Sequence, residues 1–441
     1  MRGEDIRAAR KARGWSLPAL VAALRDAAER EGIHLMEAPS LKVALSRWEN
    51  GHVKPDKTHS RLLAQVLSIP YAGDALDQGV DYPVDATSAI VLMDSLAEGD
   101  HQNDPALLSA SAITSSASSK VVTGYLFGQS LSLATPEPLF GVAIADQIRS
   151  TVARMMTMDF QRGGGHVRQV LMRYYRAEVV PQLHAVHPAL ARREIFSAAA
   201  EVAQLLGWSA YDAGRHAAAS RYFVQGLRMA AEAGDHLLGA RLLANLSHQA
   251  NFVGNYQDAV MYARAAQTAL RGQGTPSVET MCVMMEARGL ASLADQRGAS
   301  AAIHRADQLF ERRNSDEPTW IGYYDAAELA GDTSHCFRDL QLAPQTRASI
   351  RAALTDGTPP RTRAFIQMVA GDAALIAGDL EEAGALAAAA VINADGLQSA
   401  RYLRYLSDFR RRLPPGAERH PALTEFIDLV RVNHPAVLAQ R

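Results

Sequence analysis

From Val167 onwards the sequence alternates alanine-rich helical patterns with short turns, and this repetition constrains the possible fold more than any other feature. The turns recur with a loose period of about 40 residues. They lie at residues 212–214, 253–255, 296–298, 330–332 and 377–379. Each turn separates two helical patterns, so the repeating unit is a helix pair that buries its apolar face only by stacking on its neighbours. The sequence therefore predicts an all-α protein whose larger part is an α-solenoid.

Two of these units resemble the tetratricopeptide repeat (TPR). The first unit carries small and apolar residues at the offsets of that repeat, which are Leu206, Gly207, Gly214, Ala219 and Phe223. The last unit matches through Gly371, Gly378 and Ala383. The middle units are degenerate, so the resemblance implies a TPR-like array of helix pairs over residues 139–441.

The first helix of each pair is expected to face the hollow of the solenoid with residues spaced i, i+3, i+7 and i+10 or i+11. In the first unit these are Glu201, Gln204, Trp208, Tyr211 and Asp212. In the second they are Arg241, His248 and Asn251, and in the third Arg288, Ser292 and Asp295. Aromatic groups beside carboxylates, amides and arginines suit a peptide or a small polar ligand. A solvated groove with ordinary polar residues is the open alternative.

Near the N-terminus, the stretch LKVALSRWENGHVKP from Leu41 to Pro55 predicts an amphipathic helix. Leu41, Leu45 and Trp48 recur at helical spacing, which indicates a buried face with Trp48 in the core. The opposite side then presents Lys42, Val43, Ser46 and Arg47. Asn50 and Gly51 supply the turn that ends such a helix. A basic, reachable helix face is what the major groove of DNA accepts, although a solvated surface helix is the simpler alternative.

Three further helical patterns surround this stretch. One begins near Ile6 and breaks at Gly14, and the next begins after Ser16, a suitable N-cap, and buries Leu20 and Leu24. The last runs from about residue 58 to 67. Together the four resemble the Cro/lambda-repressor-type (XRE) helix-turn-helix domain. The matching residues are Ile6, Arg7, Arg10, Gly14, Ser16, Leu20, the SRWENG run from Ser46 to Gly51 after Leu45, Pro55, Leu63, Ala64 and Leu67.

The resemblance covers roughly 70 of the 441 residues and assigns roles within residues 1–70. It implies that Arg10 and Glu49 form a structural clamp between the first and third helices. It places the base-reading positions at Lys42, Val43 and Arg47, with Ser46 as a secondary candidate. Residues after the recognition helix would meet phosphates, and these are Asn50, His52, Lys54 and Lys57.

Two features depart from the XRE pattern. The segment between Leu24 and Leu41 is about 14 residues longer than the usual tight turn. Leu17 stands where family members often carry a glutamine that contacts the DNA backbone. We expect the added residues to lengthen the second helix to Glu31 and then to loop to Pro39.

Between the two regions, residues 71–138 contain Gly, Pro, Asn and Ser interruptions, which predict an irregular connection or linker. The run FQRGGGHVR after it, from Phe160 to Arg168, resembles one in large actinobacterial regulators that join an XRE domain to helical repeats. The glycines from 163 to 165 before His166 can cap a helix or cradle an anion, and without a preceding strand we favour the cap or hinge.

The C-terminal run from Arg401 to Arg412 interleaves basic and aromatic residues, as in some nucleic-acid-binding segments. Leu403, Leu406 and Phe409 recur at helical spacing, however. We therefore favour an amphipathic helix that caps the solenoid.

Composition excludes several classes. The net charge is −2, so a DNA contact has to be local; residues 1–70 hold 12 Lys and Arg against 8 Asp and Glu. Only Cys282 and Cys336 occur, and His335 beside Cys336 is too little for zinc. There is no HExxH or GxSxG signature, so we expect no enzyme, metal or cofactor. No signal peptide or long apolar run is visible, which predicts a cytoplasmic protein with no membrane partner.

These patterns predict a sequence-specific DNA-binding transcriptional regulator. It would consist of an N-terminal helix-turn-helix domain followed by a TPR-like α-solenoid. A homodimer would bind double-stranded DNA, and the solenoid would bind a peptide or small-molecule effector or mediate dimerisation. The alternative is a protein–protein scaffold with a degenerate helix-turn-helix domain. The long insertion and Leu17 favour that alternative.

Overall fold

The computed structural model describes residues 3–30, 35–50, 53, 55–67, 86–104, 107–108, 111–127, 142–162, 164–270 and 272–439. Within these ranges the chain is all-α and has no β-strand, as predicted. It divides into two compact units, residues 1–78 and 79–441. None of the described helices is long and apolar enough to cross a membrane.

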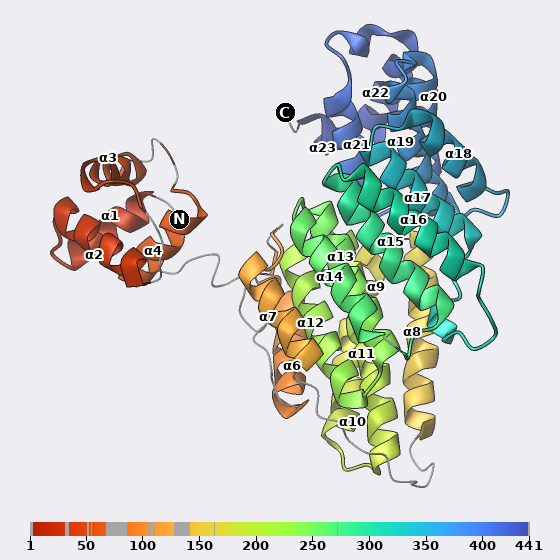
Figure 1. Cartoon of the computed structure of the whole chain (residues 1–441), viewed down its shortest axis with the longest axis horizontal. Coiled ribbons are helices and arrows are strands. Elements are labelled where there is room, and N and C mark those ends of the chain that lie inside the picture. Colours follow the sequence, from red (N-terminus) through yellow and green to blue (C-terminus); the bar gives the residue numbers. More distant parts are fainter. Residues whose placement is uncertain are drawn as a thin grey trace. The chain divides into compact units, whose positions relative to one another are not determined.

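In the described residues of the first unit, four helices pack around one small core (Figure 1). They are α1 (Gly3–Ala12), α2 (Leu17–Arg30), α3 (Ala38–Glu49) and α4 (Lys57–Leu67). Each contributes leucines or isoleucines at helical spacing, and the fully buried ones are Ile6, Leu20, Leu41, Leu45, Leu62 and Leu63. The packing places α3 against both α1 and α2.

The helix ends in this unit follow from local chemistry. Gly14 adopts φ +67°, a left-handed conformation that costs glycine little, and so turns the chain between α1 and α2. The Ser16 hydroxyl accepts a hydrogen bond from the Ala19 amide at 3.2 Å, which confirms the predicted N-cap. The inserted segment lengthens α2 to Arg30, as expected; Glu31 lies outside the described residues.

The second unit begins with helices that precede the repeats (Figure 1). They are α6 (Ala86–His101), α7 (Ser115–Phe127), α8 (Val142–Arg162), α9 (Gly164–Tyr174), a π-helical turn at Tyr175–Val179 and α10 (Val180–His184). The predicted glycine cap falls between α8 and α9, where residue 163 lies outside the described residues.

Five sequential helix pairs follow and pack on one another as in a solenoid, which confirms the predicted architecture. The pairs are α11 (Ala189–Asp212) with α12 (His216–Ala233), α13 (His236–Phe252) with α14 (Tyr256–Ala269), α15 (Pro276–Ser292) with α16 (Gln296–Phe310), α17 (Ala326–Asp339) with α18 (Ala343–Ala353), and α19 (Pro360–Ile376) with α20 (Leu380–Asn393). A 3₁₀ turn at Thr319–Ile321 precedes the fourth pair. The unit ends with α21 (Ala400–Arg412), a 3₁₀ turn at Ala417–Arg419, α22 (Pro421–Asn433) and α23 (Pro435–Ala439).

Three of the five predicted turns are correct. Gly214, Gly254 and Gly378 adopt positive φ and separate the helices of the first, second and fifth pairs. The turn predicted at 296–298 is about one helical turn late, because α16 already begins at Gln296 and Ala294 adopts the left-handed conformation.

The turn predicted at 330–332 is wrong. Gly331 lies inside α17, and the chain turns instead at Gln341, whose φ is +61°. A Cβ atom on Gly331 would lie 3.3 Å from the Cδ1 atom of Ile366, so the small residue serves the close packing of α17 on α19.

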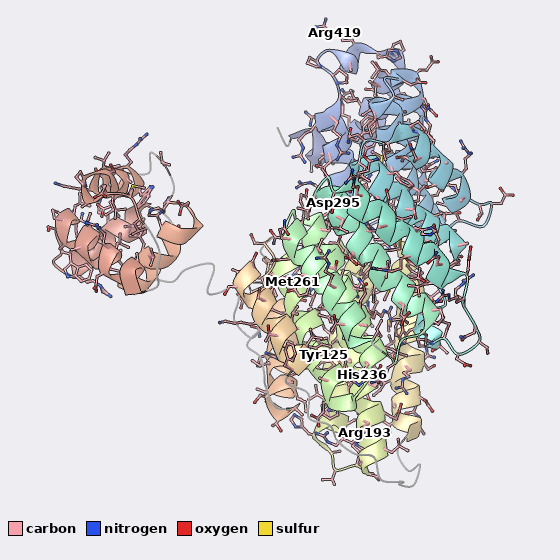
Figure 2. All side chains as sticks on the ribbon, viewed as in Figure 1. Tyr125, Arg193, His236, Met261, Asp295 and Arg419 are labelled. Carbon is pink, nitrogen blue, oxygen red and sulfur yellow. The ribbon has the colours of Figure 1, made fainter. Side chains whose placement is uncertain are left out.

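The prediction of an irregular connection over residues 71–138 is wrong for α6 and α7. The Asp100 carboxylate of α6 is fully buried, 2.6 Å from the Arg168 guanidinium and 3.0 Å from that of Arg215. Tyr125 of α7 packs so closely on α13 that a Cβ atom on Gly239 would lie 1.8 Å from its hydroxyl (Figure 2). Their sequences are weakly amphipathic, so tertiary contacts with the solenoid decide their structure.

The solenoid closes on itself at α11. The carboxylate of Asp212, at the end of α11, accepts hydrogen bonds at 2.8 Å from Arg361 of α19 and from Ser399 just before α21. Helix α8 lies along α11 and also contacts α19. The first and last pairs therefore meet, and the hollow of the array is a partly open cavity.

Candidate functional site

The predicted clamp between the first and third helices is present. Arg10 donates from Nε to Glu49 Oε1 at 2.6 Å and from its terminal nitrogen to Oε2 at 2.8 Å. A third bond reaches the Trp15 carbonyl at 2.8 Å. The hydrogen bond that Arg10 donates to Glu49 raises the pKa of Arg10, so the guanidinium stays charged. This bidentate pair fixes the end of α3 against α1.

Trp48 lies in the core of the first unit, as predicted. Its side chain is 6 % exposed, and its ring centroid lies 4.9 Å from that of His59 on α4. With Leu41 and Leu45 fully buried beside it, α3 has one orientation, and its remaining face is directed to solvent.

That outer face carries the predicted base-reading residues. Lys42, Val43 and Arg47 are exposed, and Ser46 is half-buried. Within the described residues, neither Lys42 nor Arg47 forms an ion pair. The structure thus gathers two uncompensated cations and an apolar side chain on one helix face, while their contact with DNA bases stays a prediction.

The predicted phosphate contacts are less well placed. The Asn50 amide donates to the Ser46 carbonyl at 2.7 Å and accepts from Arg7, so it caps α3 within the unit. His52 and Lys54 lie outside the described residues, as does the side chain of Lys57, the first residue of α4. These four assignments stay predictions.

The second unit holds a cavity of ≈ 560 Å³ between α8 and the first helices of the pairs, with α21 and residues 323–325 completing the wall. This volume suits a small organic molecule. Five predicted groove residues do line it, namely Gln204, Trp208, Arg241, His248 and Arg288.

The other predicted groove residues do not line the cavity. Glu201 is held by Arg149 of α8 at 3.1 Å, and Asp212 is fully buried in the closing contact. Asp295 caps α16 by accepting the Gly298 amide at 2.9 Å. Tyr211 lies behind the wall, and Asn251 and Ser292 stand further along their helices. None of these six lines this cavity, and their assignment to an effector groove stays a prediction.

Several lining residues were not predicted. They come from α8, from residues 323–335 and from α19 and α21: Met156, Asp159, Tyr323, Tyr324, Glu328, Asp332, His335, Arg361, Phe365, Arg401 and Tyr405. The aromatic cluster around Trp320 and Tyr323 was a signal in the sequence. So was the alternation of arginine and tyrosine at the start of α21. That helix is amphipathic with Leu406 and Phe409 fully buried, as expected, and it also presents Arg401 and Tyr405 to the cavity.

A hydrogen-bonded network crosses one wall. The Tyr211 hydroxyl lies 3.0 Å from Nδ1 of His248, whose Nε2 lies 3.1 Å from the Arg288 guanidinium. Burial and the nearby arginines hold the pKa of His248 well below its usual value, so the ring is neutral and Nε2 accepts from Arg288. Arg288 also pairs with Asp332 at 2.9 Å, and Tyr324 donates to the same carboxylate at 2.9 Å. The network fixes this wall.

Two carboxyl groups of the lining have raised pKa values. Burial, aided by Asp332 and Asp325, raises the pKa of Glu328 to about 7. Burial raises the pKa of Asp159 to about 6, although the Ser209 hydroxyl donates to it at 2.9 Å. Both groups change protonation near neutrality, so the charge of the cavity depends on pH.

No group of three metal-binding side chains occurs in the part of the chain that the structure describes. No family model, no curated protein and no solved structure matches this chain.

Proposed function

We propose that this chain is a sequence-specific DNA-binding transcriptional regulator whose helical-repeat unit binds an effector. The observation that carries the proposal is the exposed face of α3, where Lys42, Val43 and Arg47 stand on a helix fixed from behind by the Arg10–Glu49 pair. Lysine and arginine can donate to guanine O6 and N7, and valine can contact a thymine methyl group. The resemblance of residues 1–70 to XRE domains supports the same interpretation.

The proposed mechanism uses two copies of the chain. A homodimer would place two α3 helices in successive major grooves, about one helical turn apart. An effector in the cavity would change DNA affinity only under two conditions. The dimer must have two arrangements that differ in DNA affinity, and the effector must bind one of them more tightly than the other. Under these conditions, binding in the cavity would be coupled to DNA binding by the first unit.

The test is a salt titration of binding to duplex DNA, followed by fluorescence anisotropy. Full-length protein should bind at about 50 mM salt and weaken steeply as salt is added, because phosphate neutralisation releases counterions. Arg47→Ala should lower affinity for the preferred site by about 1–3 kcal/mol and relax the preference there. Arg431→Ala removes an exposed arginine from α22, where it is ion-paired with Asp428; this variant is the control and should change neither.

Absence of binding at low salt would overturn the proposal and favour the scaffold alternative. Equal losses in the Arg47 and Arg431 variants would show that binding is non-specific attraction to the whole surface.

A further inference from the structure

Four arginines line the cavity, and their partners differ. Arg288 pairs with Asp332 at 2.9 Å, and Arg361 pairs with Asp212 at 2.8 Å. Arg401 lies 3.4 Å from the same Asp212 carboxylate. Arg241 of α13 forms no ion pair within the described residues. It is therefore the lining arginine without an ion-pair partner, and Glu201 attracts its charge only from beyond ion-pair distance.

Arg241 is also deeply buried. Its side chain is 4 % exposed, and its guanidinium lies 4.7 Å from the ring centroid of Trp320 and 6.0 Å from that of Tyr323. Its one polar contact beyond these rings is to the sulfur of Met156 at 3.7 Å, and its Nε has no hydrogen-bond partner. Burial lowers the pKa of Arg241, in contrast to the paired Arg288.

A second unused donor stands one helical turn along α13. The Asn245 side chain lines the same cavity, is 6 % exposed, and its Nδ2 has no hydrogen-bond partner in the described structure. Residues four apart lie on one face of a helix, so Arg241 and Asn245 present their donors side by side. The nearest acid of the preceding pair, Glu201, is already held by Arg149.

A buried cation without a close counter-ion loses its hydration and gains no compensating ion pair, which is unfavourable. Stacking on aromatic rings recovers only part of that cost. Unpaired donors of this kind are satisfied by a ligand that brings its own acceptors. The apolar side of the cavity, built from Trp208, Met281, Met285 and Phe365, indicates what the rest of such a ligand touches.

We propose that the cavity binds a small organic molecule with an apolar, aromatic body and an oxyanion head, and that Arg241 and Asn245 receive the head. A carboxylate and a phosphate offer the same acceptor chemistry to these donors. The inference deepens the effector role proposed above and rests on it for biological meaning. The binding event itself does not require DNA.

The test uses full-length protein and a set of small aromatic carboxylic acids, each paired with its uncharged primary amide, together with the matching aryl phosphates. Binding is measured by ligand-observed NMR and by the rise in Tm, without DNA. The acids or the phosphates should bind and their amides should bind at least tenfold more weakly, since only the charged head pairs with Arg241. Whichever of the two anions binds more tightly identifies the head group.

Variants show which residues cause the preference for the anion over the amide. Arg241→Met should abolish the preference for the anion over the amide, Arg241→Lys should retain part of it, and Asn245→Leu should weaken it. Arg264→Met, which removes an exposed arginine from α14, is the control and should leave it intact. Failure of every anion to bind, equal binding of acids and amides, or an unchanged preference in Arg241→Met would each overturn the inference. None of these outcomes touches the DNA-binding proposal, whose assay contains no such ligand.

Discussion

In the first unit, Lys42 and Arg47 stand exposed on α3 without an acid partner in the described structure, whereas in the second unit Arg241 is unpaired and only 4 % exposed. The exposed cations keep their hydration, so they cost the folded protein little free energy. They attract any polyanion at long range, and added salt screens this attraction. The buried cation has lost its hydration and acts only on a ligand that enters the cavity. The two proposed anion sites should therefore differ in range and selectivity.

The two units also fix their sites differently. In the first, one bidentate pair between Arg10 and Glu49 holds α3. In the second, the wall depends on contacts between helices far apart in the sequence, above all those of Asp212 with Arg361 and Ser399. The residues of the first site therefore belong to a local sequence motif, whereas those of the second are brought together only by the closed fold.

The largest effect is expected from breaking the closure of the solenoid. Asp212→Ala leaves the buried guanidinium groups of Arg361 and Arg401 without their acid, and breaking a buried ion pair costs about 3–5 kcal/mol. The free energy of unfolding of the second unit, measured by urea denaturation, should fall by that amount. Asp295→Ala removes only the N-cap of α16 and should cost about 1 kcal/mol. Similar losses in the two variants would contradict the closing role of Asp212.

Replacing an arginine of the cavity should have a smaller effect on stability, and this effect should differ between the paired Arg288 and the unpaired Arg241. Arg288→Met leaves Asp332 with only the Tyr324 hydrogen bond and should destabilise the ligand-free protein by about 2–3 kcal/mol. Arg241→Met removes a buried charge that has no ion-pair partner, so its free energy of unfolding should lie within about 1 kcal/mol of that of the wild type or exceed it. Thermal unfolding of both variants measures the contrast. A greater loss in Arg241→Met than in Arg288→Met would show that Arg241 has a structural partner.

The clamp of the first unit should have an effect of similar size or less. Glu49→Gln replaces two charge-assisted hydrogen bonds to Arg10 and should destabilise the first unit by about 2 kcal/mol. Hydrogen exchange in α1 and α3 of the full-length protein measures the loss of protection. Glu37→Gln, at the exposed start of α3 where the side chain makes no capping bond, is the control and should leave exchange unchanged. If exchange in α1 and α3 were the same in Glu49→Gln as in the wild type, the clamp would not hold α3.

A further effect concerns pH. The pKa of Glu328 is raised in the folded protein to about 7, so folding favours its protonated form, and stability falls as pH rises from about 4.5 through 7. Glu328→Gln stays neutral, so its free energy of unfolding should rise relative to that of the wild type across that window, by about 3 kcal/mol, with no further rise above it. The Tm difference between the two proteins isolates this group, because Asp159 titrates in both. A pH-independent difference would contradict the raised pKa.

Sequence reasoning succeeded where one residue type has one local consequence. Gly14 turns the chain, Ser16 caps α2, and the spacing of Leu41, Leu45 and Trp48 places α3 on the core. It failed at Gly331, because a glycine inside a helix and a glycine in a turn look alike in sequence, and only the approach of Ile366 distinguishes them.

Only part of the lining of the candidate cavity could be predicted from the sequence, for a related reason. Gln204, Trp208 and His248 follow from the periodicity of the first helix of each pair. Arg361 and Arg401 were missed because periodicity does not report that the last helices of an array return to the first. The same limit applies to α6, whose buried Asp100 is paired by arginines about 70 and 115 residues away.

The most direct test of the function is selection of bound sequences from random duplex DNA by full-length protein at low salt. If α3 reads DNA, one sequence motif should be enriched, and Arg47→Ala should lose the preference at one part of it while keeping the rest. Recovery of DNA without any enriched motif, or of no DNA at all, would contradict a sequence-specific regulator.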